Sequence, residues 1–185
     1  MRALPTTLPG VILLELVAHE DARGELVELY HRDRHAALGV AVDLTFVQDN
    51  LARSRGGVVR GLHVQLTRPQ GKLVSVVRGA IFDVAVDVRR GSPTFGRWFG
   101  TTLSAADRRQ LWIPPGFAHG YQALGDGADV AYKLTATYAP EDERAVRWDD
   151  PALAIAWPRP GDALLSARDR SAPRFADAEL PRYAS

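Results

Sequence analysis

The sequence predicts an all-β fold of the sandwich or jelly-roll type, with a few short helices. Short apolar–polar alternating stretches recur at intervals of roughly 8–12 residues, separated by glycine and proline turns. Helical periodicity is nearly absent. The stretch 81–88 shows the strand pattern most clearly, because its alternation places four apolar side chains on one face: Phe82, Val84, Val86 and Val88.

Apolar stretches bounded by turn residues predict the strands in chain order. They are Val11–Val17, Glu25–Tyr30, Leu44–Asn50, Val58–Val64, Lys72–Val77, Ala80–Val88, Trp98–Leu103, Gln110–Ile113, His119–Leu124 and Asp129–Ala136. Glycine, proline and aspartate favour chain reversal and predict turns between them. These turns are expected at Asp21–Gly24, Arg53–Gly57, Arg78–Gly79 and Gly91–Pro93.

Two short helical segments interrupt this pattern. We expect a helix over His31–Leu38, because Gly39 follows as a stop signal, and a helical turn over Ala139–Glu143. From Trp157 onward proline and charged residues dominate, which predicts an irregular tail packed on the barrel. No repeat or linker divides the chain, so residues 1–185 are expected to form a single domain.

The composition excludes several classes of protein. The net charge is +1 with acids and bases interspersed, so nothing indicates binding to nucleic acid or a membrane surface. The absence of cysteine excludes disulfides, thiolate metal sites and a cysteine nucleophile. The N-terminal residues lack an apolar stretch of signal-peptide length, so by default we expect a soluble cytoplasmic protein.

Lysine is rare in this chain. Of 23 basic residues only Lys72 and Lys133 are lysines, and the others are arginines. Against that background a lysine suggests a need for a compact donor whose pKa can shift, which arginine cannot supply. The alternative is that both lysines are chance survivors of a strong arginine bias.

The first half of a metal-site motif is partly present. Gly57, His63 and Gly79 have the spacing that resembles the first motif of a cupin, a double-stranded β-helix of the jelly-roll class. Gln65 stands where that motif has a second histidine, and Lys72 is the residue nearest the usual glutamate. A lysine ammonium would repel a divalent cation at this place.

The second cupin motif is also incomplete. Pro114, Gly116 and His119 fit it, but Ala123 ends it in place of a polar residue. Two imidazoles alone rarely hold a metal. The sequence therefore predicts a cupin-type barrel without a metal site, performing organic acid–base chemistry, and the alternative of a metal-dependent oxygenase would need iron bound at His63 and His119.

Four residues could carry such chemistry. His63 is a candidate base, although a lone histidine is more often structural. Lys72, pointing into an apolar barrel, would need a negative charge such as an enolate oxygen. Tyr132 could donate a proton or simply pack in the core, and Asp169 could orient His63 or be one more surface charge.

Other polar residues could bind a phosphorylated ligand. Arginine binds diphosphate through paired hydrogen bonds, and the candidates are Arg23, Arg60 and Arg168, with Arg53 and Arg55 behind them. Gln48-Asp49-Asn50 could contact a nucleobase and diphosphate, or could be only a polar strand end. We expect Arg60 to point away from His63 unless its strand bulges, and Gly61 to leave room for a ligand.

Long ordered motifs resemble one family. Arg60–His63, Pro69–Lys72, Phe82–Asp87, Gly91–Gly96 and Gln110–Gly120 closely resemble dTDP-4-dehydrorhamnose 3,5-epimerases, and the likeness runs from about Ile12 to Pro173. The resemblance implies a homodimeric jelly roll without cofactor that inverts C3 and C5 of dTDP-4-dehydro-6-deoxy-D-glucose. It further implies His63 as base paired with Asp169, Tyr132 as acid, and Lys72 as stabiliser of the C4 oxyanion.

The same resemblance implies a set of substrate contacts, some of them across the dimer. They are Arg23, Glu28, Gln48, Asp49, Asn50, Arg60, Lys72, His119, Glu143 and Arg168. The chain departs from the family at Leu26 and Tyr121, where phenylalanine is common, at Val64, where an aromatic residue is usual, and at Arg168, which is often lysine. None of these departures removes a catalytic group, but they leave open an epimerase that acts at one carbon only. A separate alternative is a non-catalytic cupin that binds the nucleotide sugar.

Overall fold

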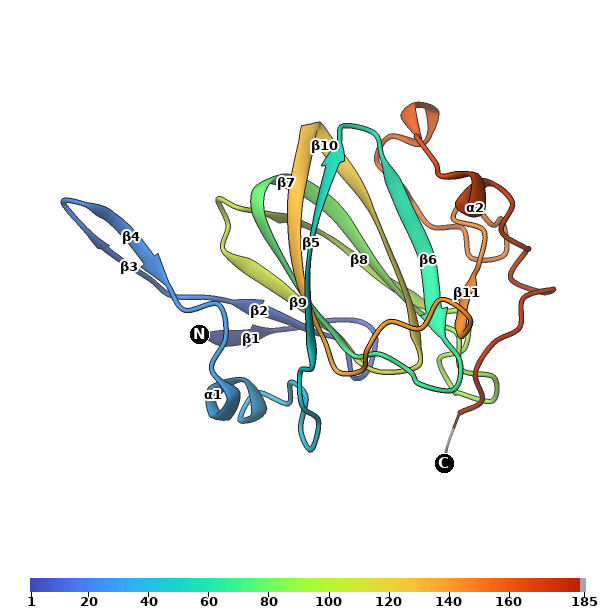
Figure 1. The fold of residues 1–185 in the computed structure, drawn as a ribbon, viewed down its shortest axis with the longest axis horizontal. Helices are drawn as coiled ribbons and strands as arrows, with labels where there is room; N and C mark the ends of the chain where they lie inside the picture. The colour runs from blue at the N-terminus through green and yellow to red at the C-terminus, as the bar shows by residue number, and fades with distance from the viewer. Residues whose placement is uncertain (184–185) are drawn as a thin grey trace.

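The computed structural model describes residues 1–183, and most of its regular elements are β-strands (Figure 1). In chain order these are β1 (Arg2–Leu4), β2 (Ile12–Glu15), β3 (Ala18–Asp21), β4 (Gly24–Val27), α1 (Arg32–Ala36), β5 (Gln48–Arg55), β6 (Val59–Gln65), β7 (Lys72–Asp87), β8 (Trp98–Ser104), β9 (Arg109–Ile113), β10 (Phe117–Leu134), β11 (Glu143–Ala145), a 3₁₀ turn (Pro160–Asp162) and α2 (Ala167–Arg170).

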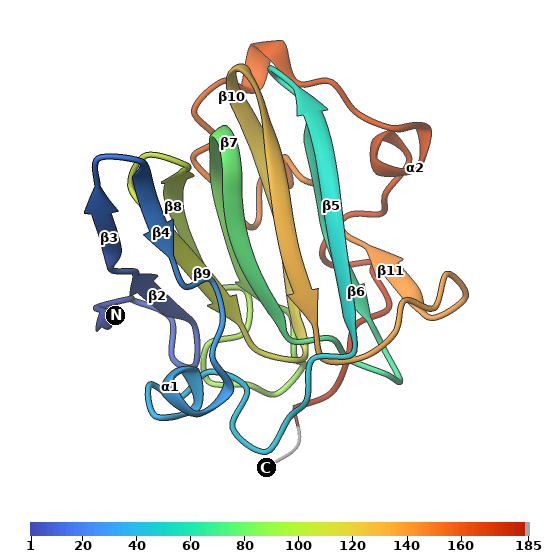
Figure 2. The same ribbon diagram turned by 60° about the vertical axis from the view of Figure 1, so that its left-hand side comes forward.

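Two long antiparallel strands, β7 and β10, organise the barrel. The second half of β7 pairs with β8 and with the first half of β10, which also pairs with β6, and β6 pairs with β11. The first half of β7 pairs with β9 and with the second half of β10, which pairs with β5. The barrel strands of the described residues form one nine-stranded sheet, which the two long strands fold into two facing halves, called here the two sheets. This arrangement is a jelly roll, and the predicted cupin-type fold class is confirmed (Figure 2).

The predicted hairpin turn at Arg78–Gly79 is wrong, because β7 bends there and continues. Gly79 has φ +74° and Gly127, across the strand pair, has φ +122°. A Cβ atom on Gly79 would lie 2.0 Å from the Gly127 carbonyl oxygen, so only glycine permits this close approach of the two backbones. The stretches predicted as four separate strands are therefore two bent ones.

Two other local predictions also need correction. The strand predicted to end at Asn50 is β5, which runs on through Arg55, so the predicted basic turn is confined to Gly56 and Gly57. The helical turn predicted over 139–143 is shorter than expected: a single turn is closed by the Asp142 N–H donating to the Ala139 carbonyl oxygen at 3.0 Å, and residue 143 already begins β11, which pairs with β6. Both strands depend on partners distant in sequence, which local patterns do not report.

The outer face of β6 and of the second half of β7 is covered by the C-terminal part of the chain. Val84 and Val86 are fully buried there against Trp148 and Trp157. The apolar face predicted from the alternation of 81–88 is therefore real, but it points out of the barrel toward this segment. Asp83, on the opposite face, points inward. Trp157, Ala178 and Leu180 from the C-terminal part of the chain belong to this buried cluster.

A separate two-stranded hairpin, β3–β4, extends from the barrel (Figure 1). Its turn lies at Asp21–Gly24, as predicted. Among the residues on and beside it, Val17, Leu26 and Leu29 expose 52%, 71% and 48% of their surface. None of the helices in the described residues 1–183 is long and apolar enough to cross a membrane.

Candidate active site

A cavity of about 860 Å³ lies between the two sheets. Its walls carry polar side chains from β5, β6, β7 and β10, and from the segments around β11 and α2. Most of the predicted site residues line it, namely Gln48, Asn50, Arg60, His63, Lys72, His119, Tyr132, Glu143, Arg168 and Asp169. The fold thus brings together residues that are up to 121 positions apart in the sequence.

His63 and Asp169 form a hydrogen-bonded pair. His63 Nε2 lies 2.6 Å from Asp169 Oδ1. Burial raises the pKa of the Asp169 carboxyl, but the hydrogen bonds and charge of His63, with contacts from Ser166 and Gly61, outweigh it and leave that pKa below its usual value. An ionised carboxylate only accepts, so Nε2 carries the proton of the neutral imidazole. The Nδ1 lone pair is then free to take a proton.

The short helix α2 places Asp169. The Ser166 hydroxyl accepts a hydrogen bond from the Asp169 backbone N–H at 3.0 Å and caps the helix. The side chain of Asp169 is buried, although it comes from a segment rich in exposed charges. The carboxylate reaches His63 only because this segment folds back onto β6.

Lys72 opens β7, as predicted, and its side chain lines the cavity. Loss of solvent around the ammonium lowers the pKa of Lys72 to about 8, against the opposing effect of the nearby Glu143 and Asp83 carboxylates. Within residues 1–183 these two carboxylates act on the ammonium through their charges and not through hydrogen bonds. It is therefore available to a ligand with negative charge.

His119 is held by a second buried carboxylate. His119 Nε2 lies 2.7 Å from Asp83 Oδ1, and Asp83 is fully buried. Burial lowers the pKa of His119 more than the charge and hydrogen bond of Asp83 raise it. The ring is therefore a neutral imidazole, and its hydrogen bond to Asp83 fixes its orientation in the cavity.

Glu143 connects three residues at one side of the cavity. Its carboxylate is paired with the Arg168 guanidinium, accepts a hydrogen bond from the Tyr138 hydroxyl at 3.2 Å, and lies 3.9 Å from His63 Nδ1. Gln48 joins this side, because its Oε1 accepts from the Tyr138 backbone N–H at 2.8 Å. These contacts fix polar groups around the free nitrogen of His63.

Arg60 faces the cavity together with His63, although regular alternation would separate them. The pairing of β6 with β10 shifts register between His119 and Tyr121, which is the bulge that the sequence left open. Gly61 does not leave room for a ligand, however. A Cβ atom there would lie 2.5 Å from the Cα of Gly120, so the missing side chain admits the neighbouring strand.

Arg23, Glu28 and Asp49 lie outside this cavity. Arg23 is at the tip of the β3–β4 hairpin, has a 90% exposed side chain and pairs with Asp21. Glu28 pairs with Arg34 beside α1. Asp49 points to the other face of β5 and forms an ion pair with Lys133 at 2.8 Å.

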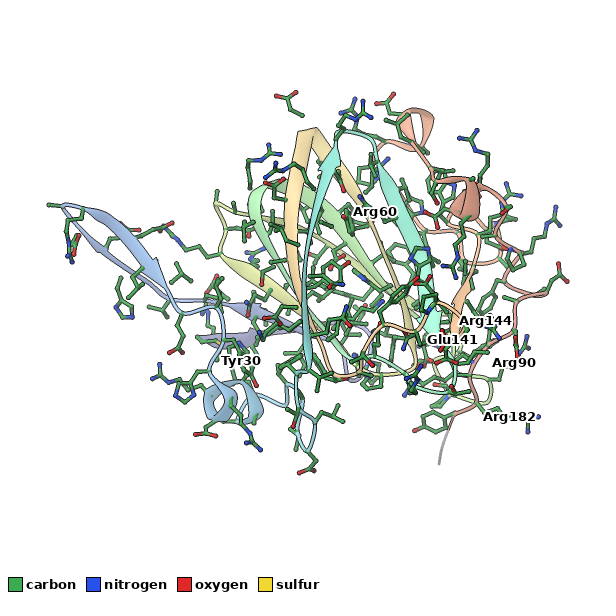
Figure 3. The ribbon with its side chains drawn as sticks, in the orientation of Figure 1. Tyr30, Arg60, Arg90, Glu141, Arg144 and Arg182 are labelled. Carbon is green, nitrogen blue, oxygen red and sulfur yellow. The ribbon has the colours of Figure 1, made fainter. Side chains whose placement is uncertain are left out.

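The two arginines predicted behind the main candidates, Arg53 and Arg55, also differ in position. Arg55 lines the cavity, whereas Arg53 is tied to Asp129 at 3.1 Å. Figure 3 shows Arg60 near the upper part of the barrel and Tyr30 at its foot near α1. Lys133 Nζ lies 5.3 Å from the centre of the Tyr30 ring, and the second rare lysine does not line the cavity.

Comparison with known proteins decides which family this arrangement represents. Residues 5–177 match the family model described as dTDP-4-dehydrorhamnose 3,5-epimerase. The chain belongs to this epimerase family. A member from Pseudomonas aeruginosa, named dTDP-4-dehydrorhamnose 3,5-epimerase, is 51% identical over 97% of this chain and 98% of its own length.

Two further family members are informative. The crystal structure of dTDP-6-deoxy-D-glucose-3,5-epimerase from Legionella pneumophila, in complex with dTDP-4-keto-L-rhamnose, is 45% identical, covers 100% of this chain and 99% of its own, and has a TM-score of 0.95. A relative from Streptomyces niveus, named dTDP-4-dehydrorhamnose 3-epimerase, is 43% identical over 100% of this chain and 91% of its own length. The family thus includes proteins named 3-epimerases and proteins named 3,5-epimerases.

The donor set of this epimerase-family cavity does not fit the metal of a typical cupin. In the described part of the chain no three His, Asp or Glu side chains are grouped to hold an ion. Gln65, at the place of a metal-binding histidine, instead bonds the backbone of Arg68, Thr137 and Ala139. Lys72 adds a positive charge, so no reaction step is assigned to a metal.

No role was predicted from the sequence for three residues of the site: Tyr121 and Tyr138, which line the cavity, and Asp83, which contacts His119. Asp83 interrupts an apolar strand on its inward face, which is a signal that the alternation already contained. Tyr121 was noticed only as a departure from the family. Tyr138 follows β10 in a loop and is 46% exposed, and nothing local distinguishes it from a surface tyrosine.

Proposed function

We propose that this protein epimerises C3 and C5 of dTDP-4-dehydro-6-deoxy-D-glucose and forms dTDP-4-dehydro-L-rhamnose. The observation that carries this proposal is the convergence of a carboxylate-oriented histidine, an unpaired ammonium and a tyrosine on one cavity in a chain of the 3,5-epimerase family. These are the groups that proton abstraction beside a ketone needs.

In the proposed first step His63 Nδ1 removes the proton from a carbon next to the C4 ketone. The resulting imidazolium is stabilised by Asp169 and by the nearby Glu143 carboxylate. Negative charge moves to the C4 oxygen, where the Lys72 ammonium stabilises it. A donor of this kind is typically worth about 3–4 kcal/mol, or a hundred- to a thousandfold in rate.

In the proposed second step Tyr132 returns a proton to the opposite face of the same carbon. Tyr132 and His63 lie on different strands, β10 and β6, and both line the cavity. Return from the opposite face inverts the carbon. His63 then loses its proton to water and Tyr132 regains one, which restores both groups for a second cycle that inverts the other carbon. No electron transfer is needed, so the proposal includes no cofactor.

The remaining polar residues of the cavity are proposed to bind the nucleotide. Arg60 and Arg168 would bind the diphosphate, since a guanidinium matches two phosphate oxygens at once. Gln48, Asn50 and His119 would contact the base and the sugar. The hydrogen bond from Gln48 Nε2 to Asn50 Oδ1, at 2.9 Å, holds these two amides in a defined orientation.

We further propose a homodimer in the cytoplasm in which Arg23 and Glu28 serve the partner's cavity. The β3–β4 hairpin extends from its own barrel, and neither residue lines the cavity of its own chain. The exposed apolar Leu26 and Leu29 beside them suit a protein contact. Asp49, also outside the cavity, is assigned to substrate binding by the family resemblance alone.

Hybrid dimers should report this sharing. We expect the double variant Arg23→Ala, Glu28→Ala and the variant His63→Asn to be nearly inactive alone. Coexpressed, they should recover about a quarter of wild-type activity, because half of the dimers are hybrids with one intact site. If the coexpressed protein is dimeric by sedimentation but recovers no activity, Arg23 and Glu28 act on the cavity of their own chain.

Solvent exchange tests the proposed reaction. In D₂O the wild-type protein should introduce deuterium at C3 and C5 of the substrate, which NMR resolves carbon by carbon. Because deprotonation precedes inversion, exchange must accompany every turnover. Exchange at neither carbon would leave only the non-catalytic binding alternative.

Epimerisation at C3 alone is the second candidate function. It is favoured by the similarity to the Streptomyces niveus protein, which is named a 3-epimerase. The same NMR spectra separate the two candidates, because a 3-epimerase would exchange and invert C3 and leave the C5 proton in place.

A further inference from the structure

Tyr121 and Ser54 form a hydroxyl pair between Arg60 and the cavity. The Arg60 Nε–H donates to Ser54 Oγ at 3.1 Å, and Ser54 Oγ lies 3.0 Å from Tyr121 Oη. Ser54 and Tyr121 are 4% and 3% exposed. Tyr121 and Arg60 also line the cavity, so the chain of contacts begins and ends at its wall.

The number of available protons determines which hydroxyl donates in this series of hydrogen bonds. Ser54 has one hydroxyl proton, and its oxygen already accepts from Arg60. Within residues 1–183 its only other hydrogen-bond partner is Tyr121. If Tyr121 donated to Ser54, the buried Ser54 proton would have no acceptor, which is unfavourable. Ser54 therefore donates to Tyr121.

The Tyr121 proton is then left over. Because Tyr121 lines the cavity whereas Ser54 does not, this proton can be accepted by a ligand bound there. Burial raises the pKa of the Tyr121 phenol, which keeps it protonated and a donor at neutral pH. The guanidinium of Arg60 is further held by the Arg53 carbonyl oxygen at 3.4 Å. Two donors, the guanidinium and the phenol, are thus fixed side by side on paired strands, since Tyr121 and Arg60 are register partners.

We infer that Tyr121 and Ser54 act as a hydroxyl relay that positions Arg60 and adds one hydrogen-bond donor for the diphosphate of the nucleotide sugar. The inference rests on the proposed function in taking that ligand to be a dTDP-sugar. Tyr121 is a positioning and binding residue in this scheme, and it takes no part in proton transfer. Phenylalanine at this position would fill the same space without either role.

The variants Tyr121→Phe and Ser54→Ala test the relay. Each should weaken binding of dTDP, measured by calorimetry, by roughly three- to tenfold, which is the usual range for one hydrogen bond. The double variant should have about the same dTDP affinity as whichever single variant binds dTDP less tightly, because both changes break the same series of hydrogen bonds. If the losses of dTDP affinity in the two single variants multiplied in the double variant, the two hydroxyls would act independently, which would contradict a relay.

Kinetics separate this role from a merely structural one. Tyr121→Phe should raise KM for the substrate by a similar factor and leave kcat within about twofold, because the diphosphate is bound alike in ground and transition states. Tyr183→Phe, which changes a tyrosine that does not line the cavity, is the matched control and should change neither dTDP affinity nor KM. Wild-type dTDP affinity in Tyr121→Phe would overturn the inference.

The inference and the proposed function fail in different ways. A wild-type protein that binds dTDP but exchanges no substrate protons would refute the proposed reaction, while the dTDP measurements on the variants would still decide the relay. A wild-type protein that exchanges normally, together with a Tyr121→Phe variant of unchanged KM, would refute the relay alone.

Discussion

Replacing His63 with asparagine should lower kcat by roughly a hundred- to ten-thousandfold, which is the usual contribution of a positioned general base. Deuterium exchange at C3 and C5 should fall by the same factor, because the residue is assigned the step that breaks both C–H bonds. Asparagine can still donate a hydrogen bond to Asp169, so α2 should remain in place. The measurement is single-turnover kinetics combined with NMR in D₂O.

Two matched variants sharpen this prediction. Asp169→Asn keeps the shape of the pair but removes the charge that stabilises the imidazolium, so kcat should fall while dTDP binding persists. Tyr132→Phe should stop inversion but allow exchange, because His63 can return a deuteron to the face from which it took the proton. A His63→Asn protein that still exchanges at wild-type rate would require another base.

Replacing Lys72 with arginine should lower kcat by about a hundred- to a thousandfold, close to the loss of an oxyanion donor. The charge is kept, but the planar guanidinium cannot occupy the position of a compact ammonium at the C4 oxygen. Affinity for dTDP should change little, because that ligand lacks the ketone. Near-normal turnover would show that positive charge alone is sufficient.

The pH dependence gives an independent check on Lys72. Its pKa lies near 8 because burial outweighs the opposing charges of Glu143 and Asp83. The proposed role needs the protonated form, which predominates below that pH, so kcat/KM should fall about tenfold per pH unit above pH 8. In Lys72→Arg this alkaline decline should disappear, since guanidinium does not titrate in this range.

Local patterns predicted the strand content well but not the paths of the strands. Alternation marked both halves of β7 and β10, yet a glycine between apolar stretches equally allows a hairpin or a bend. The choice at Gly79 depends on the backbone of Gly127, which lies 48 positions later. β11 was missed for a similar reason, since its three residues become a strand only by pairing with β6.

The site was predicted unevenly for physical reasons. Ordered motifs marked His63, Lys72 and His119, because these lie on strands whose register fixes the direction of each side chain. Asp169 lies in the four-residue helix α2 and Glu143 begins the three-residue strand β11. The positions of such short elements are set by packing on the barrel, and spacing in the sequence does not define them. Asp83 escaped notice because its significance depends on burial and on contact with His119.

The sequence by itself determined an all-β cupin-type chain of the epimerase family, the partial metal motif that Gln65 and Lys72 interrupt, and the short list of chemical groups. These follow from residue identity and strand periodicity, which are local. Only the tertiary structure decided which groups face one cavity, that Asp169 holds His63, and that Arg23 and Asp49 lie outside. Those outcomes depend on burial and on contacts between distant segments, and such contacts exist only once the two sheets have closed.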